Sequence, residues 1–125
     1  MADQHNIYRI LVVDDEPIIC ELLAEVLRAP HRSIETRDNG PAALELLERN
    51  PVDLAFLDVR MPGMSGLELA QRIKEKSPAT HIIICTGYYA QDVCEQAQQL
   101  HVDRIFEKPL NFGELLQIAD SYTKS

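Results

Sequence analysis

Five short apolar runs recur along this chain of 125 residues, and a segment with helical spacing of its apolar side chains follows each of them. A continuous apolar run such as 8–13 is typical of a strand that is covered on both faces. Strands that alternate with helices form a parallel sheet between two helical layers, with right-handed crossovers. The pattern therefore predicts a doubly wound α/β fold, a (βα)₅ three-layer sandwich. The runs cover residues 8–13, 32–37, 53–57, 81–85 and about 102–107.

Local signals indicate where helices begin. Pro17 stands at the start of a helical segment, where its missing N–H costs nothing. Ser65 and Glu68 form a capping-box pattern for a helix over 66–76. The weak strand 32–37 is predicted to lie at an edge of the sheet, because few of its residues favour strands. The five helices are expected to begin near residues 17, 40, 66, 90 and 111, the last with Asn111 and Glu114 as a second box-like start.

Size and charge limit what the chain can do. At 125 residues we expect one domain over 1–125, with a polar N-terminal tail at 1–6 and no signal peptide or membrane span. A net charge of −8 argues against direct binding to nucleic acid. The three cysteines, Cys20, Cys85 and Cys94, have no CxxC spacing and are expected to be free thiols, which predicts a cytoplasmic protein.

Polar side chains follow four of the apolar runs, where each strand is predicted to end. Asp14 and Asp15 follow the first run, and Asp58 follows the third. Thr86 follows the fourth run and Lys108 follows the fifth. Carboxyl ends of parallel strands share one edge of the sheet, where open α/β folds bind ligands. These groups therefore predict an acidic pocket with one hydroxyl and one cation, suited to a divalent metal and a phosphoryl group.

Each of these residues also has a simpler interpretation. Asp14 and Asp15 could be carboxylates favoured by a helix dipole, and Asp58 could be a turn residue. Thr86 could merely end a strand, and Lys108 could be a solvated loop charge. Independent turn residues have no reason to fit one phosphate-binding pattern, so we favour the joint interpretation.

In its motifs the chain resembles the receiver domain of bacterial response regulators, the CheY-like fold. The resemblance extends from about Ile10 to Leu116 and implies a flavodoxin-like sheet with the strand order 2-1-3-4-5, an order that CheY itself illustrates. It implies a phosphorylation-controlled switch of a two-component phosphorelay. The motifs that carry the resemblance are residues 12–17, 57–66, 86–87 and 108–110.

The resemblance gives each polar residue a role. Asp58 is the implied phosphoacceptor, a carboxylate that attacks a phosphoryl group and forms an acyl phosphate. Mg²⁺, or Mn²⁺ in its place, offsets the repulsion between the two anions. Asp14 and Asp15, directly or through water, and Asp58 itself are the expected metal ligands, together with the backbone carbonyl of Arg60.

The remaining roles concern the phosphoryl group after its transfer. Lys108 is expected to neutralise a phosphoryl oxygen, and a cis peptide bond is expected before Pro109. Thr86 would donate its hydroxyl to the phosphoryl group, and Gly87 would leave room for that group. Because this hydrogen bond exists only in the phosphorylated state, it can favour the active form.

The partners implied by the resemblance are proteins. A sensor histidine kinase or a phosphotransfer protein would donate the phosphoryl group to Asp58. The face built from the fourth helix, the fifth strand and the fifth helix would then bind an output protein or output domain, or form a phosphorylation-dependent homodimer. The chain would catalyse its own phosphorylation and hydrolysis without being a turnover enzyme on a free substrate. Whether it acts alone or is part of a longer protein stays open.

The chain departs from the family at one position. Ile105 stands where family members usually carry a tyrosine or phenylalanine that reorients on activation. Phe106 is next to it but should point to the opposite face of the sheet. Our hypothesis is that Tyr88 or Tyr89, just after Gly87, covers the same surface as that ring.

Three further hypotheses concern how the site works. Arg60 and Tyr88 flank the acceptor and are expected to restrict the attacking water, which would prolong the phosphorylated state. One rival is a metal-dependent phosphatase with an aspartyl nucleophile, but such enzymes usually show Asp-x-Asp and a cap insertion. A second rival is a degenerate receiver that serves as an unphosphorylated binding module, which only Ile105 favours.

Overall fold

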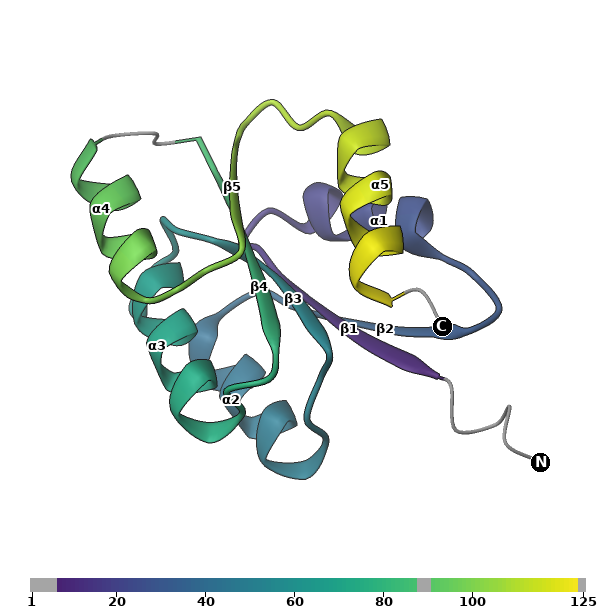
Figure 1. Cartoon of the computed structure of the whole chain (residues 1–125), viewed down its shortest axis with the longest axis horizontal. Coiled ribbons are helices and arrows are strands. Elements are labelled where there is room, and N and C mark those ends of the chain that lie inside the picture. The colour runs from purple at the N-terminus through teal and green to yellow at the C-terminus, as the bar shows by residue number, and fades with distance from the viewer. Residues whose placement is uncertain (1–6, 88–90, 124–125) are drawn as a thin grey trace.

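The computed structural model describes residues 7–87 and 91–123, and in them a parallel sheet of five strands lies between two layers of helices (Figure 1). The strand order is β2-β1-β3-β4-β5, which confirms the predicted α/β architecture. The strands are β1 (Tyr8–Val13), β2 (Arg32–Arg37), β3 (Leu54–Asp58), β4 (His81–Thr86) and β5 (Arg104–Glu107). The helices are α1 (Pro17–Leu27), α2 (Gly40–Arg49), α3 (Gly66–Lys76), α4 (Gln91–Gln99) and α5 (Phe112–Thr123).

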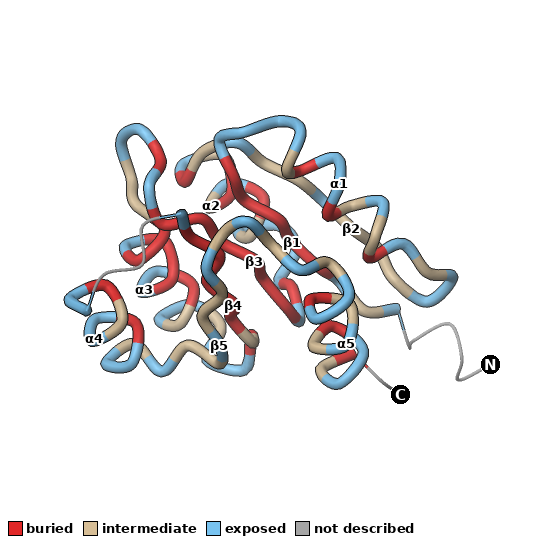
Figure 2. The backbone as a smooth tube through the Cα atoms, turned by 90° about the horizontal axis from the view of Figure 1, so that it is seen from above, coloured by how far each residue is buried: buried red, intermediate tan, exposed pale blue. Residues whose placement is uncertain are grey.

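Helices α1 and α5 cover one face of the sheet, and α2, α3 and α4 cover the other (Figure 1). The inner strands β1, β3 and β4 are almost entirely buried between the layers (Figure 2). This double burial is the reason why their sequences are continuous apolar runs instead of alternating ones. Among the described residues no helix has the length and apolarity that a membrane crossing requires.

Capping hydrogen bonds confirm two of the predicted helix starts. Ser65 Oγ accepts the Glu68 N–H at 3.2 Å, and Asn111 Oδ1 accepts the Glu114 N–H at 3.0 Å. Pro17 occupies the first turn of α1, where no intrahelical N–H is needed.

The fifth strand begins at Arg104, two residues later than the sequence pattern indicated. Asp103 explains the difference, because its carboxylate accepts the Ile82 N–H at 2.7 Å and its own N–H donates to the Ile82 carbonyl at 2.8 Å. The Asp103 side chain thus accepts the Ile82 N–H that a strand carbonyl would otherwise accept. His101, just before, has a φ of 61° and turns the chain into the strand.

Strand β2 lies at one edge of the sheet, as predicted, and β5 lies at the other. Ile105 of β5 packs on the side of the sheet that carries α2, α3 and α4. Phe106 packs on the opposite side, with α1 and α5. The prediction that the two side chains face opposite ways is therefore confirmed.

Candidate functional site

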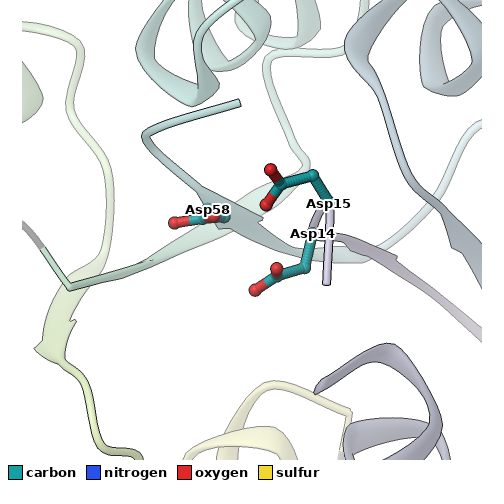
Figure 3. Close-up of side chains that lie close together, drawn as sticks. All are labelled: Asp14, Asp15 and Asp58. Atoms are coloured by element: carbon teal, nitrogen blue, oxygen red, sulfur yellow. The ribbon is translucent and has the colours of Figure 1, made fainter. Parts of the chain in front are cut away.

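Three carboxylates meet at the carboxyl edge of the sheet, as the sequence predicted (Figure 3). Val13 of β1 pairs with Leu57 of β3, so Asp14 and Asp58 follow paired positions on neighbouring strands. One oxygen from each of Asp14, Asp15 and Asp58 lies within 4.8 Å of the others. Closely spaced carboxylate oxygens are the ligands that Mg²⁺ and similar hard cations prefer. The donor set therefore fits the expected metal.

Asp14 is buried and is held at each of its polar groups. Its N–H donates to the Arg37 carbonyl at 3.1 Å, and its own carbonyl accepts the Cys20 thiol at 3.3 Å. Its Oδ1 accepts the Glu16 N–H at 2.9 Å, and its Oδ2 accepts Lys108 Nζ at 2.8 Å. Such a carboxylate is oriented before any ligand arrives.

Lys108 reaches the centre of the acidic group from β5, and its side chain is only 16% exposed. Its Nζ lies 2.8 Å from Asp14 Oδ2, 3.4 Å from Glu16 Oε1 and 3.7 Å from Asp58 Oδ2. Burial by itself would lower the pKa of Lys108, but the hydrogen bond to Asp14 and the charges of Asp14, Asp58 and Glu16 outweigh it and raise the pKa. The lysine is therefore a fixed cation at neutral pH.

The backbone that carries Lys108 is joined to the neighbouring strand. The Lys108 N–H donates to the Thr86 carbonyl at 2.8 Å, and the Lys108–Pro109 peptide bond is cis, as predicted. The end of β4 and the lysine are thus mechanically connected.

Asp58 is buried beside two other acids. Its pKa is raised from 3.8 to about 6, first by burial and then by the charge of Asp14, while the charge of Lys108 opposes the rise. The fold therefore holds the ionised Asp58 carboxylate at a free-energy cost that nearby positive charge would relieve.

The loop that follows Asp58 is closed by Gly66, whose N–H donates to the Val59 carbonyl at 2.9 Å. A Cβ at this glycine would overlap the carbonyl oxygen of Asp58 and lie 2.7 Å from its carbon. Met61 is buried in the core, and Met64 packs over Gly40, so both methionines anchor the loop. Gly66 belongs to the motif 57–66, but its contact with the Asp58 backbone could not be predicted from the sequence.

An open cleft of about 340 Å³ lies in front of the carboxylates. Glu16 was not among the predicted site residues, although it stands next to the acidic pair in the sequence. Thr86 is fully buried and is not among the described residues that line the cleft. Tyr88 and Tyr89 lie outside the described residues. The cleft is lined by Asp15, Glu16, Asp58, Arg60, Gly87 and Lys108.

Fold and site together correspond to one known family. Residues 10–120 match the family model of the response regulator receiver domain, and the chain belongs to this family. Receiver domains are the phosphorylation-based signalling domains of two-component systems, so the class of function expected from the sequence is confirmed.

Relatives of similar length include sporulation initiation phosphotransferase F of Bacillus subtilis. The two are 32% identical over 91% of this chain and 92% of that protein. The solved structure of the response regulator TrrA from Thermotoga maritima, in complex with Mg²⁺-BeF, is 39% identical, with a TM-score of 0.82 over 93% of this chain and 99% of that one. A CheY-like receiver domain from Methanospirillum hungatei has a TM-score of 0.89 at 26% identity, over 94% of each chain.

Other relatives are much longer than this chain. It matches 29% of a cyclic di-GMP phosphodiesterase from Thermotoga maritima at 33% identity, and 24% of the response regulator PilR of Pseudomonas aeruginosa at 37% identity. The match covers 87% and 86% of this chain, respectively. The shared part is therefore the receiver domain, whatever accompanies it in each protein.

Proposed function

We propose that this chain is a receiver switch that accepts a phosphoryl group on Asp58 with the help of Mg²⁺ or Mn²⁺. The observation that carries the proposal is the meeting of three carboxylate oxygens, within 4.8 Å of one another, with the Lys108 ammonium at the sheet edge. Lone turn residues would have no reason to converge in this way. The same three carboxylates and lysine argue against a degenerate receiver that serves only as an unphosphorylated binding module.

Asp15 and Asp58 line the cleft and are the side chains that would contact the cation directly. Asp14, buried behind them and bonded to Lys108, would orient the metal site and hold a metal-bound water. The Arg60 carbonyl is the expected third protein ligand in direct contact with the cation. A bound Mg²⁺ would offset the repulsion between the Asp58 carboxylate and an anionic donor.

In the transfer step a carboxylate oxygen of Asp58 attacks the phosphorus of a phosphohistidine. The new O–P bond forms as the P–N bond breaks, and the electron pair leaves on the imidazole nitrogen, which takes up a proton. Lys108 lies 3.7 Å from Asp58 Oδ2 and would pair with a phosphoryl oxygen. Hydrolysis later transfers the group to water and restores the carboxylate.

Thr86 would carry the signal away from the site. Its side chain is buried here, so a hydrogen bond from its hydroxyl to the phosphoryl group requires a local movement at the end of β4. The Lys108 N–H bond to the Thr86 carbonyl would transmit that movement to β5. The face of α4, β5 and α5 would then bind an output protein or output domain, or a second phosphorylated copy.

The donor must bring its histidine to the rim of the cleft, and α1 begins at that rim. Ile18 and Leu22 lie one turn apart on α1 and are 63% and 44% exposed. Exposed apolar side chains beside a reactive group favour a protein donor over a free small molecule. A histidine kinase or a phosphotransfer protein would therefore dock over α1.

We further propose that residues 1–125 act as one receiver unit in the cytoplasm, with 1–6 as a polar tail. Free cysteines at 20, 85 and 94 suit that reducing compartment. Phosphorylation and hydrolysis of the chain's own aspartate would make it a signalling protein and not a turnover enzyme. The unit could act alone or within a longer protein, as its relatives of both kinds illustrate.

The test is the intact mass of the protein after incubation with acetyl phosphate and Mg²⁺. We expect one phosphoryl adduct on the wild type, none on Asp58→Asn and none after addition of a chelator. Asp38→Asn, a change in the loop after β2, is the matched control and should leave the adduct in place. Wild-type protein that stays folded but gains no adduct, or an adduct that persists in Asp58→Asn, would contradict the proposal.

A further inference from the structure

Cys20 lies directly behind the acidic pocket, although no site role was expected for it. It sits one turn into α1, and its side chain points back toward the ends of β1 and β2. Its Sγ lies 3.3 Å from the Asp14 carbonyl oxygen and 3.8 Å from the Arg37 carbonyl oxygen. The residue is 7% exposed. The thiol thus bridges the helix to both strand ends at the point where the acidic pair begins.

The direction of the Asp14 carboxylate depends on its backbone, which is fixed at two points. Its N–H is held by the Arg37 carbonyl, and its carbonyl is held by the Cys20 thiol. A buried carbonyl that loses its donor pays a desolvation penalty and tends to turn toward another partner. Rotation of that peptide would change the angle at which Asp14 and Asp15 face Asp58.

The thiol also suits the available space. A cysteine is a small apolar side chain with one weak donor, so it can pack in the apolar layer and still reach a carbonyl. Leu23 is nearby on the same buried face of α1 and packs in the same core, but its hydrocarbon side chain donates no hydrogen bond. The two positions therefore separate packing from hydrogen bonding on a single helix.

We propose that Cys20 is a positioning residue for the metal site: its thiol holds the Asp14 carbonyl and thereby sets the geometry of the acidic pair. This inference rests on the proposed function, in which the pocket binds Mg²⁺. It predicts that removing the donor weakens the binding of Mg²⁺ more than it weakens the fold. Residues that support metal ligands in this way typically change metal affinity by about tenfold or more when altered.

The test compares Cys20→Ser, which keeps a donor, with Cys20→Val, which fills the space without one. Titration calorimetry with Mg²⁺ alone gives the dissociation constant, and urea unfolding in a chelator gives the stability. We expect Cys20→Val to bind Mg²⁺ about tenfold more weakly and Cys20→Ser to stay within about twofold of the wild type. Leu23→Val should lose stability with an unchanged dissociation constant. If valine prevents folding, Cys20→Ala removes the same donor and takes its place.

Kinetics provides a second measurement. The rate of adduct formation with acetyl phosphate should need more Mg²⁺ in Cys20→Val, yet approach the wild-type maximum at saturation. Equal Mg²⁺ dissociation constants for the serine variant, the valine variant and the wild type would overturn the inference. It would also be overturned if Leu23→Val lost as much Mg²⁺ affinity as Cys20→Val. A wild type that binds no Mg²⁺ would instead overturn the proposed function, and this inference with it.

Discussion

The substitution Asp58→Asn should stabilise the metal-free protein at neutral pH, although it removes the proposed phosphoacceptor. The pKa of Asp58 is raised from 3.8 to about 6, first by burial and then by the charge of Asp14. A pKa raised by about two corresponds to about 3 kcal/mol at roughly 1.4 kcal/mol for each pH unit. The neutral amide avoids this cost, so its gain in unfolding free energy should approach that value above pH 7.

The pH dependence of this gain follows from the direction of the shift. Because the pKa of Asp58 is higher in the folded protein than in the unfolded chain, protonation favours folding. The stabilising contribution of Asp58 is complete below about pH 4 and is lost as the pH rises through 6. Asparagine does not titrate, so the advantage of the variant should be largest above pH 7 and should vanish near pH 4.

Urea unfolding in a chelator at several pH values provides the measurement. Glu16→Gln is the control, because Glu16 also neighbours Lys108 but its side chain is 61% exposed, and we expect it to change stability by less than about 0.5 kcal/mol. Added Mg²⁺ should make the wild type more stable than Asp58→Asn, since a ligand of the folded state stabilises the protein that binds it better. A metal-free Asp58→Asn protein no more stable than the wild type at pH 7.5 would refute the reasoning.

Three further substitutions test separate parts of the structure. Gly66→Ala should cost about 1–3 kcal/mol of stability in urea unfolding and slow adduct formation, because the alanine Cβ would overlap the Asp58 carbonyl. Adduct formation at the same rate as in the wild type would contradict this prediction. Arg60→Ala should shorten the lifetime of the phosphorylated protein, followed by mass spectrometry, whereas slower loss of phosphate than in the wild type would exclude a shielding role. Arg32→Met should cost about 1–3 kcal/mol of stability in urea unfolding, because the buried guanidinium donates to the Thr123 hydroxyl at 3.0 Å and attaches α5 to β2. An unchanged urea midpoint of unfolding would show that this hydrogen bond contributes nothing to stability.

The sequence was sufficient for the fold and for the groups that meet at its edge. In a parallel sheet the end of one strand fixes the position of the next, so the residues after Val13 and Leu57 had to meet once the strand order was right. The apolar runs therefore placed Asp14, Asp15 and Asp58 at one edge of the sheet, and the strand order implied by the family resemblance brought them together. The capping role of Ser65 could also be predicted from the sequence, because its hydrogen-bond partner is only three residues away.

Other features depend on contacts that no local pattern encodes. Cys20 reaches the Asp14 carbonyl only because α1 folds back onto the ends of β1 and β2. Glu16 approaches Lys108 across 92 positions of sequence, through a side-chain conformation that a motif does not specify. The burial of Thr86 likewise depends on how the neighbouring elements pack over the end of β4. Such contacts appear only when the layers are assembled.

Ile105 bears on how a signal could leave the site without the usual aromatic residue. A β-branched side chain has few accessible rotamers, and Ile105 packs against the core on the side of α2, α3 and α4. It is therefore poorly suited to a large rotation. Among the described residues, the Lys108 N–H bond to the Thr86 carbonyl is a link that joins β4 and β5 beside Asp58.

If that backbone link carries the coupling, Ile105→Ala should lower stability yet leave the response to a phosphate mimic intact. Beryllofluoride with Mg²⁺ should still shift the amide resonances of α4 and β5, whereas Thr86→Ala should reduce those shifts while the mimic still binds. Wild-type protein at a urea concentration that matches the lost stability is the control. If the Ile105→Ala protein binds the mimic but shows no shifts in α4, the isoleucine itself transmits the signal. The backbone bond between Lys108 and Thr86 would then be present in the variant and yet not sufficient.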